Sequence, residues 1–145
     1  MIPNRYISPL SRKEKRIQTY RILKSRRDYK KGIYKTRKQM KSYPNKKSGH
    51  VQRAQAKFGV TSMVPSEQLA KKTGCPLSVL KKIVQKGEGA YYSSGSRPNQ
   101  TPQSWGLARL ASSLTGGPAA RVDAKELEGC SPARRYKRGG APHAL

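Results

Sequence analysis

Lysine and arginine recur densely at the start of this sequence, in runs such as SRKEKR and YKKGIYKTRK. Residues 1–57 hold 19 of these basic residues against two acids, Glu14 and Asp28, which gives the segment a net charge of +17. Each phosphate that a lysine or arginine neutralises releases condensed counterions, so such a segment is suited to a polyanionic partner. This density of positive charge therefore indicates electrostatic binding to a polyanion and not catalysis.

Residues for catalysis are scarce by comparison. The histidines are His50 and His143 alone, and the serines Ser93, Ser94 and Ser96 have no identifiable base partner in the sequence. The seven acidic residues are mostly scattered, so the sequence indicates neither an acid–base pair nor a carboxylate cage for a metal. We expect no enzyme, no catalytic residue and no cofactor.

The two cysteines, Cys75 and Cys130, are too few for a disulfide framework. Together with His50 and His143 they could in principle bind zinc, but the paired Cys-x-x-Cys spacing is missing, and we predict no metal site. Residues 1–10 lack the apolar run of a signal peptide, and no stretch reaches transmembrane length. An intracellular protein without a membrane partner is therefore expected.

The charge is distributed unevenly, and this distribution predicts three segments. The chain of 145 residues has a net charge of +25 and 34% hydrophobic residues, too few to fold every segment alone. Residues 58–129 carry only +4, and residues 130–145 carry four basic residues and no acid. We predict a mainly α-helical protein with a long basic N-terminal arm over 1–57, a small helical core over 58–129 and a short basic C-terminal tail over 130–145.

The basic arm contains recognisable helix boundaries. Ser11 and Glu14 match a capping box, in which each side chain binds the other residue's backbone N–H, and this predicts a helix from Arg12 to about Lys31 that Gly32 ends. Ile33–Tyr43 alternates weakly, as a strand or an extended arm would, before a turn at Pro44-Asn45. A short helix from about His50 to Phe58, between Ser48 and Gly59, completes the arm.

The arm has two interpretations. A run of charge can be merely solvated, or it can follow the groove of a nucleic acid through phosphate contacts. At this density of charge we favour the second interpretation.

Residues 66–87 predict two helices joined by a tight turn. Ser66 begins the first helix and Gly74 ends it, and Pro76 suits the first turn of a second helix that Gly87 closes. The pattern resembles the helix-turn-helix of DNA-binding repressors in Leu69, Ala70, Gly74, Leu80 and Ile83. The second helix would then offer DNA the residues Leu77, Ser78, Lys81, Lys82 and Lys86, of which the lysines suit phosphates better than base edges. An ordinary helical hairpin that supplies core is the alternative.

A glycine- and serine-rich loop is predicted over 87–100. Arg97 adds charge there, and Tyr91 and Tyr92 could stack on bases, or the two tyrosines could pack into the core. Thr101-Pro102 then begins a helix that Gly116-Gly117 ends, with Trp105 on its core side. Asp123 could cap a last short helix that ends at Leu127.

The runs GAYYSSGSRPNQT and SWGLARLAS resemble a family of unknown function encoded by large nucleocytoplasmic DNA viruses of algae and amoebae. The similarity extends back through SRKEKR, YKKGIYKTRKQMKSY, KKSGHVQRAQAKFGV and LAKKTGCPLSVLKKIVQKG, and thus over most of the chain. Pro118 and the residues beyond about Cys130 depart from the pattern. The resemblance implies a viral protein without an established activity, located in the virion or in the infected host cell, and it transfers no functional residue.

Two functions fit these observations. The first is a virion-associated protein that binds nucleic acid, with duplex DNA favoured, through phosphates. The second is a minor capsid or cementing protein whose basic arms tether acidic proteins of the capsid shell. The predicted polyanion-binding residues are Lys13, Arg16, Lys24, Arg27, Lys30, Lys31, Lys35, Arg37, Lys38, Lys81, Lys82, Lys86, Arg97, Tyr91 and Tyr92.

Overall fold

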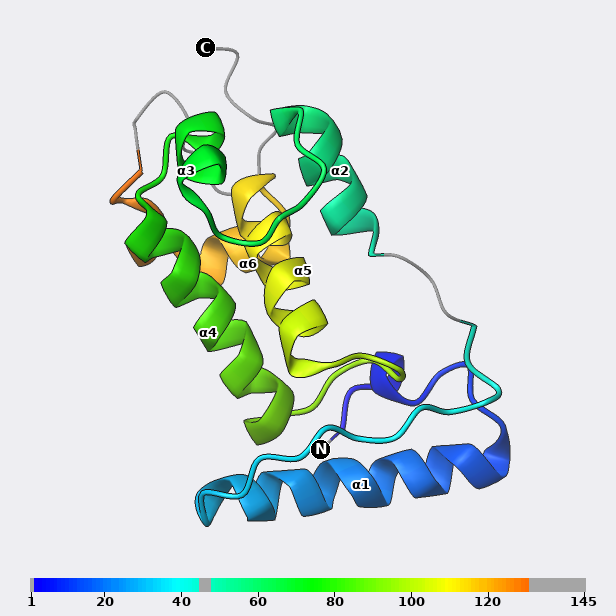
Figure 1. Cartoon of the computed structure of the whole chain (residues 1–145). Helices are drawn as coiled ribbons and strands as arrows, with labels where there is room; N and C mark the ends of the chain where they lie inside the picture. Colours follow the sequence, from blue (N-terminus) through cyan, green and yellow to red (C-terminus); the bar gives the residue numbers. More distant parts are fainter. Residues whose placement is uncertain (1, 45–47, 131–145) are drawn as a thin grey trace. The chain divides into compact units, whose positions relative to one another are not determined.

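The computed structural model describes residues 2–44 and 48–130. These residues form seven α-helices and one short 3-10 helix, Asn4–Tyr6, and no β-strand is found among them (Figure 1). The prediction of a mainly α-helical protein is therefore confirmed. No helix in the described ranges is long and apolar enough to cross a membrane.

The chain divides into two compact units. Unit 1 consists of residues 1–46 and 88–105, and unit 2 consists of residues 47–87 and 106–145. The chain passes between the units after residue 46 and again inside the fourth and fifth helices. These places differ from the predicted boundaries after residues 57 and 129. Most of the predicted tail over 130–145, with His143, lies outside the described residues, as does Asn45 of the predicted turn.

Unit 1 is built around α1 (Arg12–Lys30), which begins and ends as predicted. The Ser11 hydroxyl accepts the Glu14 backbone N–H at 3.3 Å and so caps the first turn. At the other end Gly32 has a φ of +78°, a left-handed conformation that glycine adopts without strain.

The second half of the predicted capping box is wrong. The Glu14 carboxylate does not reach back to Ser11; it accepts the backbone N–H groups of Lys41 and Ser42 at 3.0 and 2.9 Å and also the Ser42 hydroxyl. Ser11 donates its N–H to Ser42 Oγ instead. These bonds hold residues 33–43 as an irregular segment that returns along α1 (Figure 1), where the alternation had suggested a strand or an extended arm.

Residues 1–46 form a second core together with residues 88–105. Tyr6, Leu10, Ile22 and Met40 are buried in the first segment of this unit, and Tyr91 is fully buried in the second. Gly95, with a φ of +132°, lies so close to Ile22 that an added Cβ would come within 3.0 Å of its side chain. The basic segment therefore packs through a few buried side chains, while most of its described residues, its lysines above all, remain exposed.

Unit 2 contains the larger hydrophobic core. Its helices α2 (Gly49–Phe58) and α3 (Glu67–Thr73) begin at the predicted caps Ser48 and Ser66 and end at Gly59 and Gly74, both in the left-handed conformation. They pack with the unit 2 parts of α4 (Leu77–Ser93) and α5 (Pro102–Leu114) and with α6 (Pro118–Val122) and α7 (Ala124–Leu127). The buried cluster includes Ala54 and Phe58 of α2 and also Leu80, Ile83 and Leu110.

Gly87 does not end its helix, contrary to the prediction, because α4 continues to Ser93. A Cβ placed on Gly87 would lie 2.6 Å from the Gly106 Cα, closer than real Cβ atoms approach a backbone. The two glycines therefore allow α4 and α5 to pack backbone against backbone where they lie side by side in Figure 1. The loop predicted over 87–100 accordingly starts only after residue 93.

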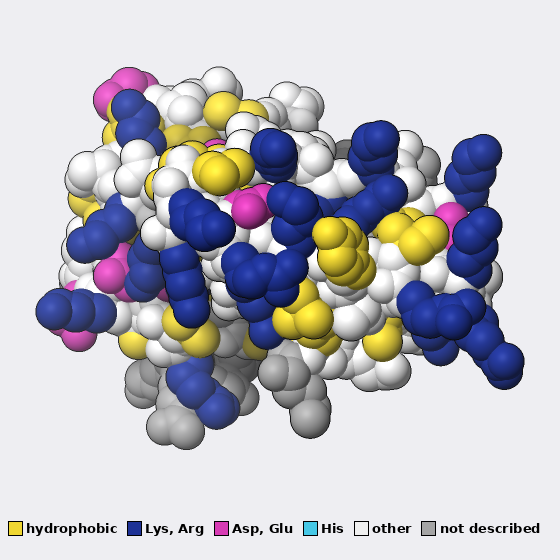
Figure 2. Space-filling view, turned by 90° about the horizontal axis from the view of Figure 1, so that it is seen from below, with side chains coloured by type: hydrophobic (Ala, Val, Ile, Leu, Met, Phe, Trp, Pro, Cys, Tyr) yellow, Lys and Arg dark blue, Asp and Glu magenta, His cyan; other side chains and the backbone are white. Residues whose placement is uncertain are grey.

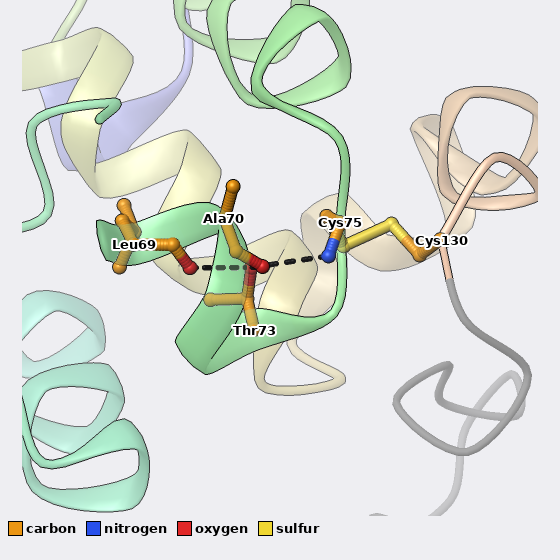
Figure 3. The surroundings of a disulfide bond; sticks show 5 residues. All are labelled: Leu69, Ala70, Thr73, Cys75 and Cys130. Atoms are coloured by element: carbon orange, nitrogen blue, oxygen red, sulfur yellow. Dashed lines mark hydrogen bonds between the residues drawn. A yellow bond between two sulfur atoms is a disulfide. The ribbon is translucent and has the colours of Figure 1, made fainter. Parts of the chain in front are cut away.

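The two cysteines form a disulfide between Cys75 and Cys130, which the sequence had not indicated. Cys75 lies in the turn between α3 and α4, and its N–H donates to the Thr73 hydroxyl, which itself donates to the Leu69 carbonyl oxygen (Figure 3). The bond joins positions 55 residues apart in sequence and closes the last described residue of the chain onto this turn.

Candidate polyanion-binding surface

The structure distributes the predicted binding residues over both units. Twelve of them lie in unit 1, on α1, on the segment after it and on residues 88–105. The other three, Lys81, Lys82 and Lys86, lie on the unit 2 part of α4. Unit 1 as a whole has 17 basic residues against three acids.

On α1 the predicted cations are exposed to solvent. They are Lys13, Arg16, Lys24, Arg27 and Lys30. The two acids of this helix already have partners, because Glu14 binds Lys41 and Ser42 and Asp28 pairs with Lys24 at 3.0 Å. Figure 2 shows Lys and Arg side chains spread over the face that carries α1, with hydrophobic side chains between them. The surface therefore keeps a strong positive charge.

Three more cations, Lys31, Lys35 and Lys38, are exposed on the segment that returns along α1, and Arg97 is exposed in the loop after α4. Arg37 differs from them, because its guanidinium donates to Ser25 Oγ, the Tyr91 carbonyl oxygen and Ser96 Oγ at 2.9 to 3.0 Å. Its burial lowers the pKa of Arg37. Arg37 thus joins three parts of unit 1, and its hydrogen-bonding capacity is largely used inside the protein.

The two tyrosines predicted to stack on bases are placed differently from each other. Tyr91 is fully buried, so its ring belongs to the core of unit 1. Tyr92 is partly exposed, and burial is the main cause of the raised pKa of its hydroxyl.

Tyr92 has two aromatic neighbours that sequence reasoning missed. Its ring stacks at an interplanar angle of 10° with Tyr29 and lies 5.2 Å, between centroids, from Tyr34. Neither neighbour belongs to the loop predicted over 87–100. The sequence did contain one indication of this cluster: Tyr29 and Tyr34 lie on either side of Gly32, whose turn brings the chain back onto the end of α1.

The α3–α4 hairpin of unit 2 has the buried contacts that the helix-turn-helix pattern predicted. Leu69, Leu80 and Ile83 are buried, and Gly74 makes the left-handed turn. Lys81 and Lys82 are exposed, whereas Lys86 lies 3.0 Å from Glu126 and 3.2 Å from Asp123. Lys86 is therefore neutralised by its own protein, and the hairpin presents fewer cations than predicted.

Asp123 stands at the start of α7, but its side chain does not cap that helix. The carboxylate is fully buried and accepts two hydrogen bonds from Arg109, at 2.6 and 3.0 Å, and one from Ser113 at 2.7 Å. Burial would raise the pKa of Asp123, but the bonds from Arg109 and Ser113 outweigh it, so the pKa lies below its ordinary value. This cluster is an internal ion network that holds α5 to α6 and α7.

In residues 2–44 and 48–130, no three His, Cys, Asp or Glu side chains come together as a metal site would require. Of the four residues weighed for zinc, Cys75 and Cys130 are bonded to each other, and His143 lies outside the described residues.

A family model described as "Family of unknown function (DUF5824)" matches residues 3–127. The match includes residues of both units and ends just before Cys130. No curated protein and no solved structure matches this chain.

Proposed function

We propose that this chain, which belongs to the DUF5824 family of unknown function, is a non-enzymatic protein that binds DNA through phosphate contacts. The exposed cations of unit 1 would make these contacts. They are Lys13, Arg16, Lys24, Arg27, Lys30, Lys31, Lys35, Lys38 and Arg97.

The observation that carries the proposal is the excess of exposed cations on a packed scaffold. Unit 1 has 17 basic and three acidic residues, and the acids of α1 are bound locally by Lys24, Lys41 and Ser42. Self-repulsion of this size opposes folding, so a bound polyanion would stabilise the unit. Nucleic acid supplies closely spaced phosphates along a groove, which suits cations displayed along a helix of 19 residues.

The virion is the location that we propose for this binding. It is supported by the resemblance of GAYYSSGSRPNQT and SWGLARLAS to a virus-encoded family. The packaged viral genome would then be the DNA that unit 1 contacts.

A salt titration of duplex DNA binding by the full chain tests the proposal. Each phosphate contact contributes roughly −0.9 to the slope of log K against log salt concentration. A variant with Lys30, Lys31 and Lys35 changed to Gln should lose affinity and flatten the slope by about two to three. The matched control changes Lys71, Lys72 and Lys125 of unit 2 to Gln, which removes the same charge from exposed positions outside unit 1.

The control variant should retain the slope of the unaltered protein. Equal losses in both variants would mean that net charge alone, and not unit 1, determines binding. Absence of salt-dependent binding by the full chain would contradict the proposal.

A second function is favoured by the apolar side chains exposed on α1. Tyr20 and Leu23 are 59% and 39% exposed, and phosphate binding does not require them. A minor capsid or cementing protein would use such side chains, with the cations around them, against an acidic protein of the shell. Co-sedimentation of the chain with empty capsids, lost in a Tyr20→Ser and Leu23→Ser variant that still binds DNA, would favour this function.

A further inference from the structure

We propose that Tyr29, Tyr34 and Tyr92 form a stacking site for unpaired bases, so that unit 1 binds single-stranded nucleic acid in preference to duplex. This inference rests on the proposed function, because it specifies the form of nucleic acid that the same basic surface takes. It assigns the bases to the three rings, which we call the tyrosine cluster, and the phosphates to the lysines beside them.

The three rings contact one another although they come from separate parts of the chain. Tyr29 lies at the end of α1, Tyr34 follows the Gly32 turn, and Tyr92 lies near the end of α4. Between centroids, Tyr29 is 5.6 Å from Tyr34 and 6.3 Å from Tyr92, and Tyr34 is 5.2 Å from Tyr92. The rings therefore hold one another in place before any ligand arrives, which reduces the entropy lost on binding.

Tyr92 also contacts the core of unit 1. The buried Tyr91 ring meets it edge-on, at a centroid distance of 5.2 Å and an interplanar angle of 88°. The Arg37 guanidinium lies 3.8 Å from the Tyr91 ring centroid. Tyr91 is thus packed inside the protein, and the tyrosine cluster contacts this buried ring through Tyr92.

The cluster nevertheless remains open to solvent. Tyr34 is 58% exposed and Tyr29 is 37% exposed, whereas Tyr91, the next tyrosine in contact, has no exposed surface. Ile33 beside Tyr34 is 40% exposed as well. Aromatic rings that served only the core would be covered as Tyr91 is, so this exposed aromatic surface is suited to a flat apolar partner.

Charge determines which flat partner fits. Lys30 and Lys31 precede Tyr34 in the chain, Lys35 follows it, and all three are exposed. A neutral aromatic ligand would gain nothing from these cations, whereas a nucleic-acid strand provides a phosphate for each base. In a duplex the faces of the bases are covered by their neighbours, so only an unpaired strand offers both groups at once.

Fluorescence anisotropy with the full chain and two labelled strands tests this inference. One probe is a short oligothymidine, and the other is an abasic strand of the same length, which has the same phosphates and no bases. The unaltered protein should bind oligothymidine more tightly than the abasic strand by roughly five-fold or more, since one stacked base is worth ~1–3 kcal/mol.

Tyr34→Ala should remove most of that difference and leave the affinity for the abasic strand unchanged. Tyr34→Phe keeps the ring and should restore the preference. The matched control is Tyr20→Ala, because Tyr20 is as exposed as Tyr34, at 59%, but lies outside the cluster. Circular dichroism and thermal unfolding establish that each variant is folded before it is compared.

The outcomes separate the two proposals. If the unaltered protein binds both strands equally and Tyr34→Ala changes neither affinity, the stacking site is refuted and phosphate binding stands. A labelled duplex of the same length is the third probe; if the protein binds it as tightly as oligothymidine at the same salt concentration, the preference for single strands is refuted. If it binds no strand at any salt concentration, the proposed function fails, and the inference fails with it.

Discussion

Arg37 holds Tyr91 by two different groups at once. Its backbone N–H donates to the Tyr91 hydroxyl at 2.7 Å, and its guanidinium lies over the Tyr91 ring, 3.8 Å from the centroid. The same guanidinium donates to Ser25 on α1 and to Ser96 in the loop after α4. One cation of the basic segment thus connects α1, the returning segment and the second part of unit 1.

Replacing Arg37 should therefore lower the free energy of unfolding more than replacing any other cation of the basic segment. Arg37→Lys keeps the charge but loses the planar fork that reaches Ser25, Ser96 and the Tyr91 carbonyl oxygen. We expect a loss of about 2–4 kcal/mol in the free energy of unfolding, because several charge-assisted hydrogen bonds and a cation–π contact disappear. Urea denaturation measures the loss.

The neighbouring Lys38 provides the control for that experiment. It is exposed, so Lys38→Ala should change the free energy of unfolding by less than about 0.5 kcal/mol. Equal stability of Arg37→Lys and the unaltered protein would show that the guanidinium contacts contribute nothing net.

The two glycines near the middle of α4 should respond in opposite directions to alanine. Gly87→Ala places a methyl group 2.6 Å from the Gly106 backbone and should destabilise the protein by about 1–3 kcal/mol. Gly89→Ala meets nothing nearer than the Tyr29 hydroxyl, at 3.8 Å, and should stabilise the helix by roughly 0.5–1 kcal/mol. Thermal unfolding of both variants checks the prediction, and a Gly87→Ala variant as stable as Gly89→Ala would disprove the close approach of α4 and α5.

Asp123 should make the stability of unit 2 depend on pH. Its pKa is lowered in the folded protein, so its contribution is fully present above the ordinary pKa of an aspartate, about 4, and is lost as the pH falls through the lower folded value. Asp123→Asn should cost about 2–4 kcal/mol at neutral pH, because the partly buried Arg109 charge is left without a counter-charge of equal strength.

The difference in unfolding free energy between the unaltered protein and Asp123→Asn should shrink below about pH 4. Chemical denaturation at a series of pH values measures it. Glu128→Gln is the matched control, because Glu128 is exposed beside the same helix and should change little at any pH. A difference that does not vary with pH would mean that the carboxylate is not the source of the stability.

Reduction of the Cys75–Cys130 bond should lower stability substantially. The bond joins positions 55 residues apart, and closing a loop of that length is worth about 4 kcal/mol on a chain-entropy estimate. The midpoint of urea unfolding should therefore fall when dithiothreitol is added. A Cys75→Ser and Cys130→Ser double variant should have the lower midpoint throughout and be insensitive to the reductant.

The features predicted correctly from sequence are local ones. Ser11, Ser48 and Ser66 act as caps, because a cap depends on residues within three positions of it, and the glycine stops at positions 32, 59 and 74 depend only on backbone freedom. The same local rules misjudged Gly87, since a glycine that ends a helix and one that lets another helix approach look alike in a single sequence.

The errors at the candidate site arise from contacts distant in sequence. Glu14 is bound by residues 27 and 28 positions later, and Arg37 reaches Tyr91 across 54 positions. No periodicity in the basic segment indicated which of its cations would be buried. The tyrosine cluster has the same origin, because Tyr92 meets Tyr29 and Tyr34 only once the second part of unit 1 is in place.

The division of unit 1 into two stretches of sequence has a consequence for synthesis on the ribosome. Residues 1–46 leave the ribosome well before residues 88–105, which supply Tyr91 and Ser96 as the partners of Arg37. During that interval the first 46 residues, with 16 cations and two acids, lack the partners that fold them. The nascent chain therefore carries this basic segment past ribosomal RNA without those partners, and unit 1 can complete its core only after residues 47–105 have been made.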